Sequence, residues 1–532
     1  MKKFLFKKRR ELMIVISGFL TSLTLIASDL GFIEWLSLIP VAIALVLYAE
    51  DREIGYKKIY GKGVLFFMCY YLVVYHWFLY MYPLEFAGVS KWAAAVVVLF
   101  AWLGLSLIQT IGSALIFVLI IFVYRLGVVK KVRFLLPVFA AAIWTVFEWA
   151  QTIGWWGVPW GRLCLGQSNA TLFLRSSAVL GSYFVSFVIV AVNFCLAYLI
   201  VFKDRKKLLV SMALSLFCLN IALGLIVTLS YHNEGESVRF AAVQGNISTS
   251  EKWGEGTLDK TLSIHKKHTM NAALNGADVI VWSETALPYN FFEDEYLVSY
   301  MSELAKNADA TILFSAFTEG EGADYSDFSN DGLYNSLIEL KSDGSYGDKV
   351  YYKQRLVPFG EFVPMRSLIE KLIPPLAEIG LLGDDLLFGE KTVVLDSSQG
   401  KIGCGICFDS IYESISRKAV LSGAEILVVS TNDSWFSDSA ALEMHNSQSQ
   451  LRAIETGRYL VRSANTGISS IIDPLGREAK RLGALEDGVI YDDVYMRNNI
   501  TLYTYIGNLF VYLCIALIAG IIVSDMFFKK ID

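Results

Sequence analysis

Two kinds of hydrophobic pattern divide this chain. Long uncharged apolar runs fill most of the first 231 positions and return near the C-terminus, whereas the stretch between them alternates short apolar and polar pieces. A helix needs about 20 apolar residues to cross the hydrocarbon core of a bilayer. The pattern therefore predicts eight transmembrane helices, at Leu12–Ser28, Trp35–Ala49, Val64–Tyr82, Trp92–Tyr124, Phe134–Phe147, Ser176–Phe202, Leu208–Tyr231 and Asn498–Ser524.

The intervening stretch has the period of strands alternating with amphipathic helices, which indicates an α/β or α+β domain. The predicted strands are Arg239–Val243, Val279–Trp282, Thr311–Ala316, Ser336–Leu340, Val393–Leu395, Ile402–Cys407, Ile426–Ser430, Leu460–Ser463, Ser469–Ile472 and Val489–Tyr491. The predicted helices are Leu258–Leu274, Glu295–Asn307, Ile411–Ser422 and Glu443–Arg458. A stretch of this length forms one large domain rather than two.

We therefore expect three parts along the chain. Residues 1–236 form a membrane domain with seven transmembrane helices, residues 237–497 form the α/β domain, and residues 498–532 supply the last transmembrane helix and a cytoplasmic tail. Two aperiodic segments, Gly320–Gly332 and Pro374–Gly389, are predicted loops. Loops of this length serve as lids or as solvated connections, and the apolar residues of the second either dip into lipid or face inward.

Basic residues predict the orientation, because short loops rich in Lys and Arg stay in the cytoplasm. With the N-terminus inside, the cytoplasmic segments carry 20 Lys and Arg, and the three short outer loops carry 3. A cleaved signal peptide is the alternative for the basic start, but Ile26–Ala27–Ser28 is a poor cleavage site. We expect a multi-pass protein of the cytoplasmic (inner) membrane, with residues 237–497 on the extracytoplasmic, periplasmic side.

Composition agrees with a membrane protein. Hydrophobic residues make up 55% of the 532 positions and charged residues only 18%, below the usual quarter of a soluble protein. The net charge is −5, and the sequence has neither a basic aromatic stripe nor a phosphate-binding glycine loop, which are features of nucleic-acid-binding and nucleotide-binding proteins. We therefore expect the bilayer, and no nucleic acid, as a partner.

Cys407 is the first candidate for chemistry. It ends a predicted strand ahead of a helix beginning near Ile411, where helix amides lower a thiol pKa and donate to an oxyanion. A cysteine on an apolar strand is otherwise a small buried side chain. Cys404 and Cys407 have the spacing of a redox or zinc pair, but residues three apart on a strand point to opposite faces. His265 and His268 lie on a polar helix, where exposure is expected.

A cysteine nucleophile needs a base, and two upstream segments offer partners. Glu284 ends a strand and turn among apolar residues, where a carboxylate is suited to accept a proton. Lys353 lies between two tyrosines and a Pro–Phe–Gly–Glu segment, and its ammonium would stabilise an oxyanion. Taken alone, each of these two residues is as well explained as a solvent-exposed side chain without a catalytic role.

Together these segments resemble a known superfamily. Trp282–Ser–Glu284, Lys353 followed by Pro358–Phe–Gly–Glu361, and Gly405–Ile–Cys407 are similar to the Glu, Lys and Cys motifs of the nitrilase superfamily, in that order. The membrane helices, with the segments at 157–160, 243–253 and 431–436, resemble the apolipoprotein N-acyltransferase family over nearly the whole chain. The resemblance implies an α-β-β-α nitrilase-like sandwich beside a polytopic α-helical membrane domain.

The resemblance also implies a ping-pong acyl transfer. Glu284 would be the base, Cys407 the nucleophile that becomes a thioester, and Lys353 the oxyanion stabiliser. The acyl donor would be a phospholipid, and the acceptor would be the α-amino group of a diacylglyceryl apolipoprotein. No cofactor or metal is implied.

Other residues are implied in supporting roles. Glu361 would orient Lys353 or Glu284. Phe408 and Asp409, which directly follow the nucleophile, would also support the site. Asp409 stands where family members often carry a glutamate, so it keeps the charge but not the reach. The positions implied for the substrate pocket or its lids are Trp253, Asn432 and Trp435.

Two other functions remain compatible with the residues. A membrane-tethered amidase would use the same Glu, Lys and Cys with water as the acceptor. A membrane assembly or transport protein would have a soluble domain that has lost its activity. The complete set of three residues argues against the second alternative, and a membrane frame that delivers lipid argues against the first.

Overall fold

The computed structural model describes residues 2–84, 90–154, 156–202, 205–252, 256–319, 332–372 and 385–528. The chain forms two compact units. The helical unit comprises Met1–Leu79, Val96–Tyr231 and Ile506–Asp532, and the sheet unit comprises Tyr80–Ala95 and His232–Tyr505. Compared with the expected parts, the sheet unit gains Tyr80–Ala95, and its end falls eight residues later than the expected position 497.

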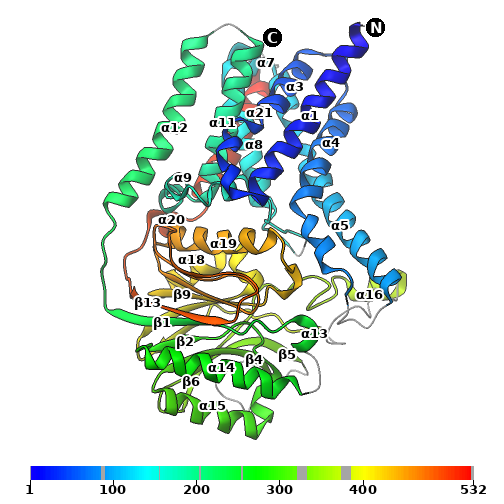
Figure 1. Cartoon of the computed structure of the whole chain (residues 1–532). Helices are drawn as coiled ribbons and strands as arrows, with labels where there is room; N and C mark the ends of the chain where they lie inside the picture. The colour runs from blue at the N-terminus through cyan, green and yellow to red at the C-terminus, as the bar shows by residue number, and fades with distance from the viewer. Residues whose placement is uncertain are drawn as a thin grey trace. The chain divides into compact units, whose positions relative to one another are not determined.

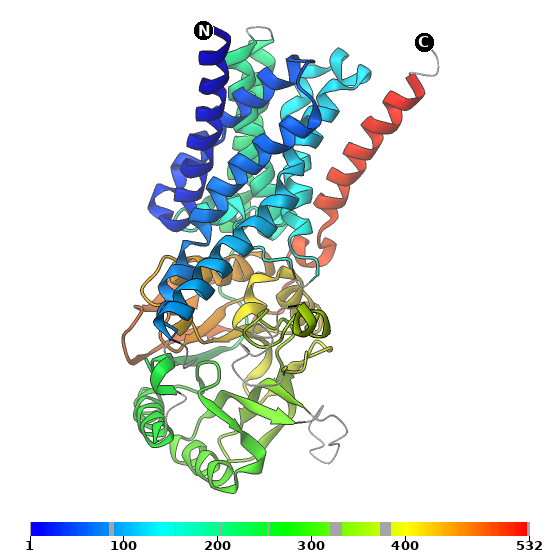
Figure 2. The same cartoon turned by 90° about the vertical axis from the view of Figure 1, so that its right-hand side faces the viewer.

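Apolar runs form the long helices, and Pro stands in the first turn of α3 and α8, where its missing N–H is harmless. Their bounds are α1 Lys2–Ile26, α2 Glu34–Ser37, α3 Ile39–Glu50, α4 Tyr56–Val74, α5 Lys91–Ser113, α6 Leu115–Arg125, α7 Gly127–Lys131, α8 Leu136–Ala150, α9 Thr171–Leu174, α10 Ser177–Leu180, α11 Ser182–Val201, α12 Lys206–Leu229 and α21 Leu509–Phe528. Within the helical unit, α11 packs against α3, α8 and α12, and α1 packs against α3 and α4 (Figures 1 and 2).

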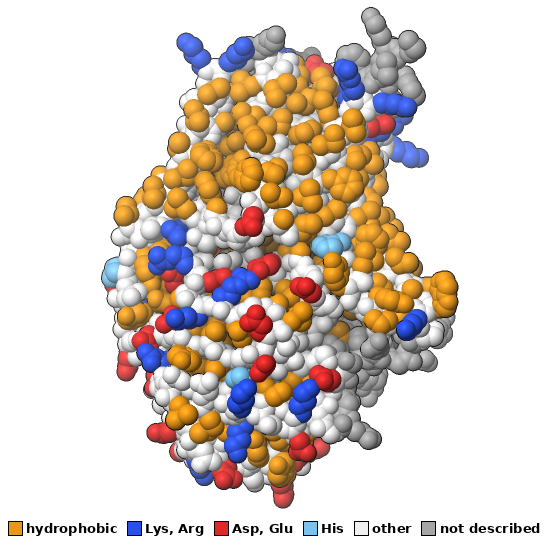
Figure 3. All heavy atoms as spheres, in the orientation of Figure 1, with side chains coloured by type: hydrophobic (Ala, Val, Ile, Leu, Met, Phe, Trp, Pro, Cys, Tyr) orange, Lys and Arg blue, Asp and Glu red, His pale blue; other side chains and the backbone are white. Residues whose placement is uncertain are grey.

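Six helical stretches of the described chain are long and apolar enough to cross a membrane: Ser28–Glu50, Lys91–Arg125, Arg133–Ala150, Ser182–Val201, Lys206–Leu229 and Leu509–Phe527. Of the other two predicted spans, Leu12–Ser28 falls almost wholly in α1, and Val64–Tyr82 begins in α4 but continues into a 3-10 turn at His76–Met81. Both α1 and α4 carry charged residues in their N-terminal halves. Apolar side chains cover the helical unit on the face in Figure 3, as lipid contact requires. The chain is therefore a multi-pass membrane protein.

The sheet unit contains two sheets of mixed direction. The first has the order β13-β1-β2-β4-β5-β6, with β3 paired to β4, and the second has the order β12-β11-β10-β9-β8-β7. Their bounds are β1 Ser237–Gln244, β2 Val279–Val281, β3 Leu287–Asn290, β4 Thr311–Glu319, β5 Leu333–Leu340, β6 Tyr346–Tyr352, β7 Val394–Ser397, β8 Gly400–Ile406, β9 Ile426–Thr431, β10 Leu460–Ala464, β11 Ser469–Ile472, β12 Glu478–Leu482 and β13 Gly488–Tyr495. All ten predicted strands are present, and β3, β6 and β12 are additional.

The two sheets share one apolar core. That core joins Phe240, Val281 and Leu313 of the first sheet to Ile406, Val428 and Val461 of the second. The outer face of the first sheet packs against α14 (Thr257–Leu274) and α15 (Glu295–Ala308), and the outer face of the second packs against α18 (Glu413–Leu421) and α19 (Ala441–Thr456) (Figure 1). The described part of the unit also contains the short helices α13 (Thr249–Lys252) and α16 (Arg366–Leu372), and α20 (Leu502–Ile506) stands at its C-terminal end.

The expectation of exposed histidines on α14 is wrong. His265 and His268 are both buried. The His265 ring packs 4.6 Å from the Trp282 ring, and its Nδ1 lies 2.9 Å from the carbonyl of Thr261. The helix is polar by composition, yet the face that carries both histidines packs against the first sheet, so burial follows from tertiary position rather than from composition.

Candidate active site

Cys407 lies at a strained turn. It follows β8 directly, has a left-handed backbone (φ 48°), and begins a 3-10 turn that ends at Ile411. The helix expected from near Ile411 begins at Glu413 instead, because the 3-10 turn comes between. Such a conformation is costly for a non-glycine residue and persists only where neighbours hold it. One neighbour is Ser410, whose hydroxyl donates to the Cys407 carbonyl at 2.7 Å.

The surroundings of the Cys407 thiol disfavour its thiolate form. Burial raises its pKa far above the usual range, and the nearby carboxylate of Glu284 raises it further. The Lys353 ammonium and the Thr431 hydroxyl act in the opposite direction. A thiol in this environment needs a base at the moment it reacts.

Glu284 is a buried carboxylate with three hydrogen-bond donors. It follows β2, and its Oε1 accepts from Lys353 Nζ and Asn335 Nδ2, each at 2.8 Å. Its Oε2 accepts from the main-chain N–H of Asn432 at 2.8 Å. These contacts come from elements far apart in the sequence, so the carboxylate is held in one orientation.

Lys353 directly follows β6 and is 1% exposed. Burial by itself would lower its pKa, but the carboxylates of Glu284 and Glu361 raise it well above the usual value. Nζ lies 2.8 Å from Glu284 and 2.9 Å from Glu361. The structure thus brings Lys353 into direct contact with Glu284 and Glu361, and the charges of Glu284 and Lys353 act on the Cys407 thiol.

Asp409 links the turn of the nucleophile to the segment that carries Lys353. Its Oδ2 accepts from the Ile406 amide at 3.0 Å and from the Tyr351 hydroxyl at 2.8 Å. Its Oδ1 accepts from the amides of Gln354 and Arg355, at 3.2 and 2.8 Å. Burial raises the pKa of Asp409 to about 6, against the lowering effect of these donors. The shorter acid therefore has enough reach to join two parts of the site.

Replacing Asp409 with Ala is expected to destabilise the protein by about 3–5 kcal/mol, because it leaves several buried donors without an acceptor. The melting temperature of the detergent-solubilised protein measures this loss. Asp348, an exposed acid on β6, is the matched control, and its replacement by Ala should change stability by less than about 0.5 kcal/mol. Equal melting of both variants would contradict the linking role.

The other predicted site residues differ in what they contact. Asn432 contributes its main-chain amide to Glu284, and its side-chain oxygen accepts from Asn465 Nδ2 at 3.1 Å. Trp435 is half-buried in a 3-10 turn, and the Phe408 ring packs edge-on against Tyr412. Trp253 lies outside the described residues. Of the apolar loop residues, Leu386 is buried against Phe317 and Leu356, whereas Phe388 is exposed, so the described part of the loop does not decide between the two expectations.

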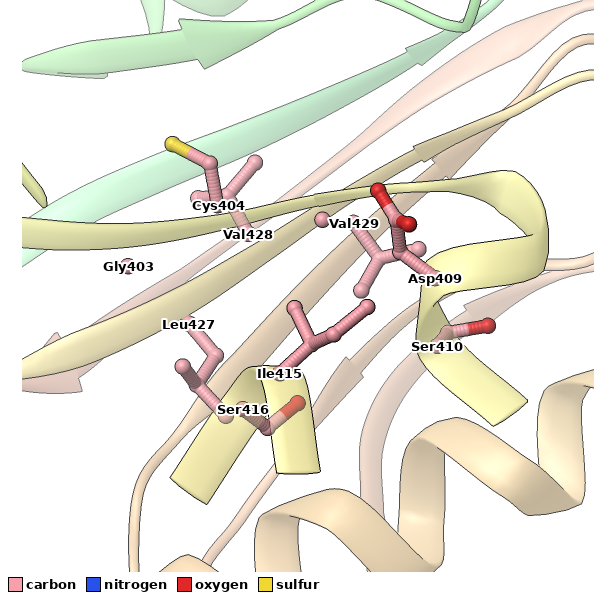
Figure 4. A pocket seen from close by; sticks show the side chains of 10 residues that line it. Gly403, Cys404, Asp409, Ser410, Ile415, Ser416, Leu427, Val428 and Val429 are labelled. Atoms are coloured by element: carbon pink, nitrogen blue, oxygen red, sulfur yellow. The ribbon is translucent and has the colours of Figure 1, made fainter. Parts of the chain in front are cut away.

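Cys404 belongs to the shared core of the sheets. Figure 4 shows its sulfur directed away from Leu427 and Ile415, on the face of β8 opposite α18. The space between β8, β9 and α18 has no room for a water molecule. No redox partner or ligand set for Cys404 is present among the described residues.

The sequence analysis did not identify several buried polar residues. They include Asn335, Lys252 and a cluster of Asp433, His445 and Arg462 next to Cys407. In that cluster His445 Nε2 lies 3.3 Å from the Cys407 carbonyl, and His445 Nδ1 lies 2.9 Å from Asp433. Cys407, Asp433 and His445 have metal-ligand spacing, within 4.8 Å of one another. However, the Arg462 guanidinium lies 2.7 Å from Asp433 and 3.0 Å from His445. A fixed cation therefore already offsets the charge of Asp433 and occupies the space beside His445 Nδ1. The cluster is better suited to hydrogen bonding than to metal binding.

Comparisons with known proteins define the class. A family model described as carbon-nitrogen hydrolase matches residues 239–498, and one described as apolipoprotein N-acyltransferase N-terminal domain matches residues 17–195. A solved amidase of the nitrilase superfamily from Nesterenkonia aligns with 52% of this chain and 97% of its own, at 16% identity and a TM-score of 0.39.

Curated relatives cover both units. An apolipoprotein N-acyltransferase from Gloeobacter violaceus is 29% identical over 92% of this chain and 88% of its own length. One from Pseudomonas syringae pv. tomato is 30% identical over 69% of this chain and 70% of its own length. The chain belongs to the apolipoprotein N-acyltransferase family.

Proposed function

We propose that this protein transfers a fatty acyl group from a phospholipid to the α-amino group of an N-terminal diacylglyceryl-cysteine in lipoproteins. The observation that carries the proposal is the buried contact of Glu284 with Lys353, beside the strained turn of Cys407, in a multi-pass membrane protein. A base, a fixed cation and a thiol are the groups that acyl transfer through a thioester requires. The names of the relatives support the acceptor class.

In the first half-reaction Glu284 accepts the proton of the Cys407 thiol, and sulfur attacks the carbonyl carbon of the phospholipid ester. The carbonyl oxygen becomes an oxyanion, which the Lys353 ammonium stabilises. Collapse re-forms the carbonyl and breaks the ester bond. The departing glycerol oxygen takes the proton from Glu284, which leaves a lysophospholipid and an acyl thioester on Cys407.

In the second half-reaction the acceptor amine attacks the thioester carbonyl. Glu284 takes a proton from the attacking nitrogen, Lys353 stabilises the second oxyanion, and collapse forms the amide as the Cys407 sulfur leaves and is reprotonated. Glu361 holds Lys353 in place through both steps by accepting from its ammonium, and the Asn335 side chain holds Glu284 by donating to its carboxylate. All the groups in this scheme are side chains, and it requires no cofactor.

Intact-mass measurement tests the proposal. The protein purified in detergent is incubated with a phospholipid of defined chains, and a mass increase of one acyl chain on Cys407 is expected. Addition of a diacylglyceryl peptide with a free N-terminus should remove that adduct and yield an N-acylated peptide. Hydrolysis at the same rate without the peptide would favour an amidase-like use of water as acceptor.

We also propose an architecture around this chemistry: an α-β-β-α sandwich joined to eight transmembrane helices. The shared core of the two sheets and the helices packed on their outer faces support the sandwich. The helical α1 and α4 support two spans beyond the six apolar stretches.

The catalytic unit is expected on the periplasmic side of the cytoplasmic membrane, because 20 Lys and Arg lie in the alternate segments and only 3 in the short outer loops. Single cysteines introduced at Asp343 and at Arg52, in a background without other exposed cysteines, should react with a membrane-impermeant maleimide in opposite ways. Position 343 should be labelled in intact cells whose outer barrier is permeabilised, and position 52 only after lysis. The reverse pattern would overturn the topology.

A further inference from the structure

Lys252 is a buried lysine that the proposed reaction does not use. It ends the short helix α13 and is 5% exposed. Its Nζ donates to the main-chain carbonyl of Glu284 at 3.0 Å and to the Thr285 hydroxyl at 2.6 Å. Both acceptors belong to the turn that presents the Glu284 carboxylate.

This turn needs support from its neighbours. Thr285 has a left-handed backbone (φ 44°), which is costly for a β-branched residue. Its amide donates to the Ser315 hydroxyl at 2.9 Å, and its own hydroxyl accepts from Lys252. The base and the nucleophile therefore both depend on a strained turn that buried side chains hold in place.

The charge of Lys252 is also placed differently from that of Lys353. Lys353 contacts two carboxylates, which offset its positive charge, whereas both hydrogen-bond acceptors of Lys252 are uncharged oxygens. Burial lowers the pKa of Lys252 to about 7, and Glu284 and Cys407 act to raise it. By the same interaction, the ammonium form of Lys252 favours the thiolate of Cys407.

We propose that Lys252 is a positioning residue of the acyl-transfer site, which fixes the turn carrying Glu284 and adds a positive charge that favours the Cys407 thiolate. This inference rests on the function proposed above. Lys252 acts through Glu284 and Cys407, so its loss should slow formation of the thioester rather than weaken phospholipid binding.

The test compares Lys252→Met and Lys252→Gln with the native protein in detergent, following the rate of acyl adduct formation on Cys407 against phospholipid concentration. Met keeps the length without a donor, and the saturating rate should fall about ten- to a hundredfold with little change in half-saturation. Gln keeps an amide donor without the charge, so the saturating rate of the Gln variant should lie between the rates of the Met variant and the native protein. Lys260→Met is the matched control, because Lys260 is an exposed lysine whose partner is Glu251, and its rate should be unchanged.

Stability provides a second measurement that separates positioning from folding. Because the folded pKa lies below the unfolded value, the contribution of Lys252 to stability is largest at high pH and is lost as pH falls toward about 7. Glu284, Cys407 and His265 are the titratable groups that interact with it. Lys252→Met should therefore melt no lower than the native protein at pH 6, despite its slower reaction.

The outcomes are distinct. Absence of an adduct on the native protein would refute the proposed function itself. With an adduct on the native protein, Lys252→Met at the native rate would overturn the inference. A Met variant that changes only the half-saturation, or only the melting temperature, would also overturn it.

Discussion

Replacing Cys407 with Ser should abolish the acyl adduct and the overall transfer. A serine hydroxyl is far less acidic than a thiol, and this site already raises the pKa of the thiol through burial and the Glu284 carboxylate. A single nearby base is therefore insufficient to activate the hydroxyl. An ester on Ser would also be a poorer acyl donor to an amine than a thioester. We expect less than about a thousandth of native activity, since removal of a nucleophile costs on that order or more.

Cys404→Ala is the matched control for this variant. Cys404 lies three residues before Cys407, on strand β8, and is also buried, but it is the Cys407 thiol on which the charges of Glu284 and Lys353 act. Its loss should reduce the melting temperature by a small amount, because only a sulfur is removed from packing, and leave most of the activity. Equal loss of activity in both variants, or inactivation of the native protein by a chelator, would contradict a cysteine nucleophile acting without a metal.

The parts of the fold that could be predicted from sequence are those whose residues are buried on both faces. The strands inside the two sheets contain short apolar stretches, and the predicted bounds agree with the observed ones within a few residues. Three strands were missed, β3, β6 and β12, and of these β6 and β12 are edges of the two sheets. Their exposed positions carry residues such as Asp348, Lys349 and Arg481, which obscure the alternation in the way that edge strands usually require.

The residues of the candidate site also differ in how well the sequence predicts them. Cys407 has a local signal, a strand that ends at a turn, so physical reasoning alone reaches it. Glu284 and Lys353 have no local signal that separates them from solvated residues, and only the family resemblance selects them. Lys252, Asn335 and His445 have neither, because their burial and their contacts with Glu284 and Cys407 arise from segments far apart in the sequence.

Lys353→Ala should lose activity at least a hundredfold, because it removes the oxyanion-stabilising charge from both half-reactions. It should also lose stability near pH 7 by about 3–5 kcal/mol, since Glu284 and Glu361 would remain buried together without a cation. Without the ammonium, the two buried carboxylates repel each other, and protonation of either one relieves that repulsion. The deficit relative to the native protein should therefore shrink on acidification.

Glu284→Gln provides the contrast that separates catalysis from packing. The amide oxygen still accepts from Lys353 and Asn335, and Lys353 stays paired with Glu361, so only the hydrogen bond from the Asn432 amide is lost. Stability should fall by about 1–3 kcal/mol with little dependence on pH. Activity should nevertheless fall at least as far as in Lys353→Ala, because no base remains for the thiol proton. Melting curves and adduct formation from pH 5 to 8 measure both effects. A Gln variant that retains native rates would exclude Glu284 as the base, and a Lys353→Ala deficit that does not shrink at low pH would show that the two carboxylates do not depend on Lys353.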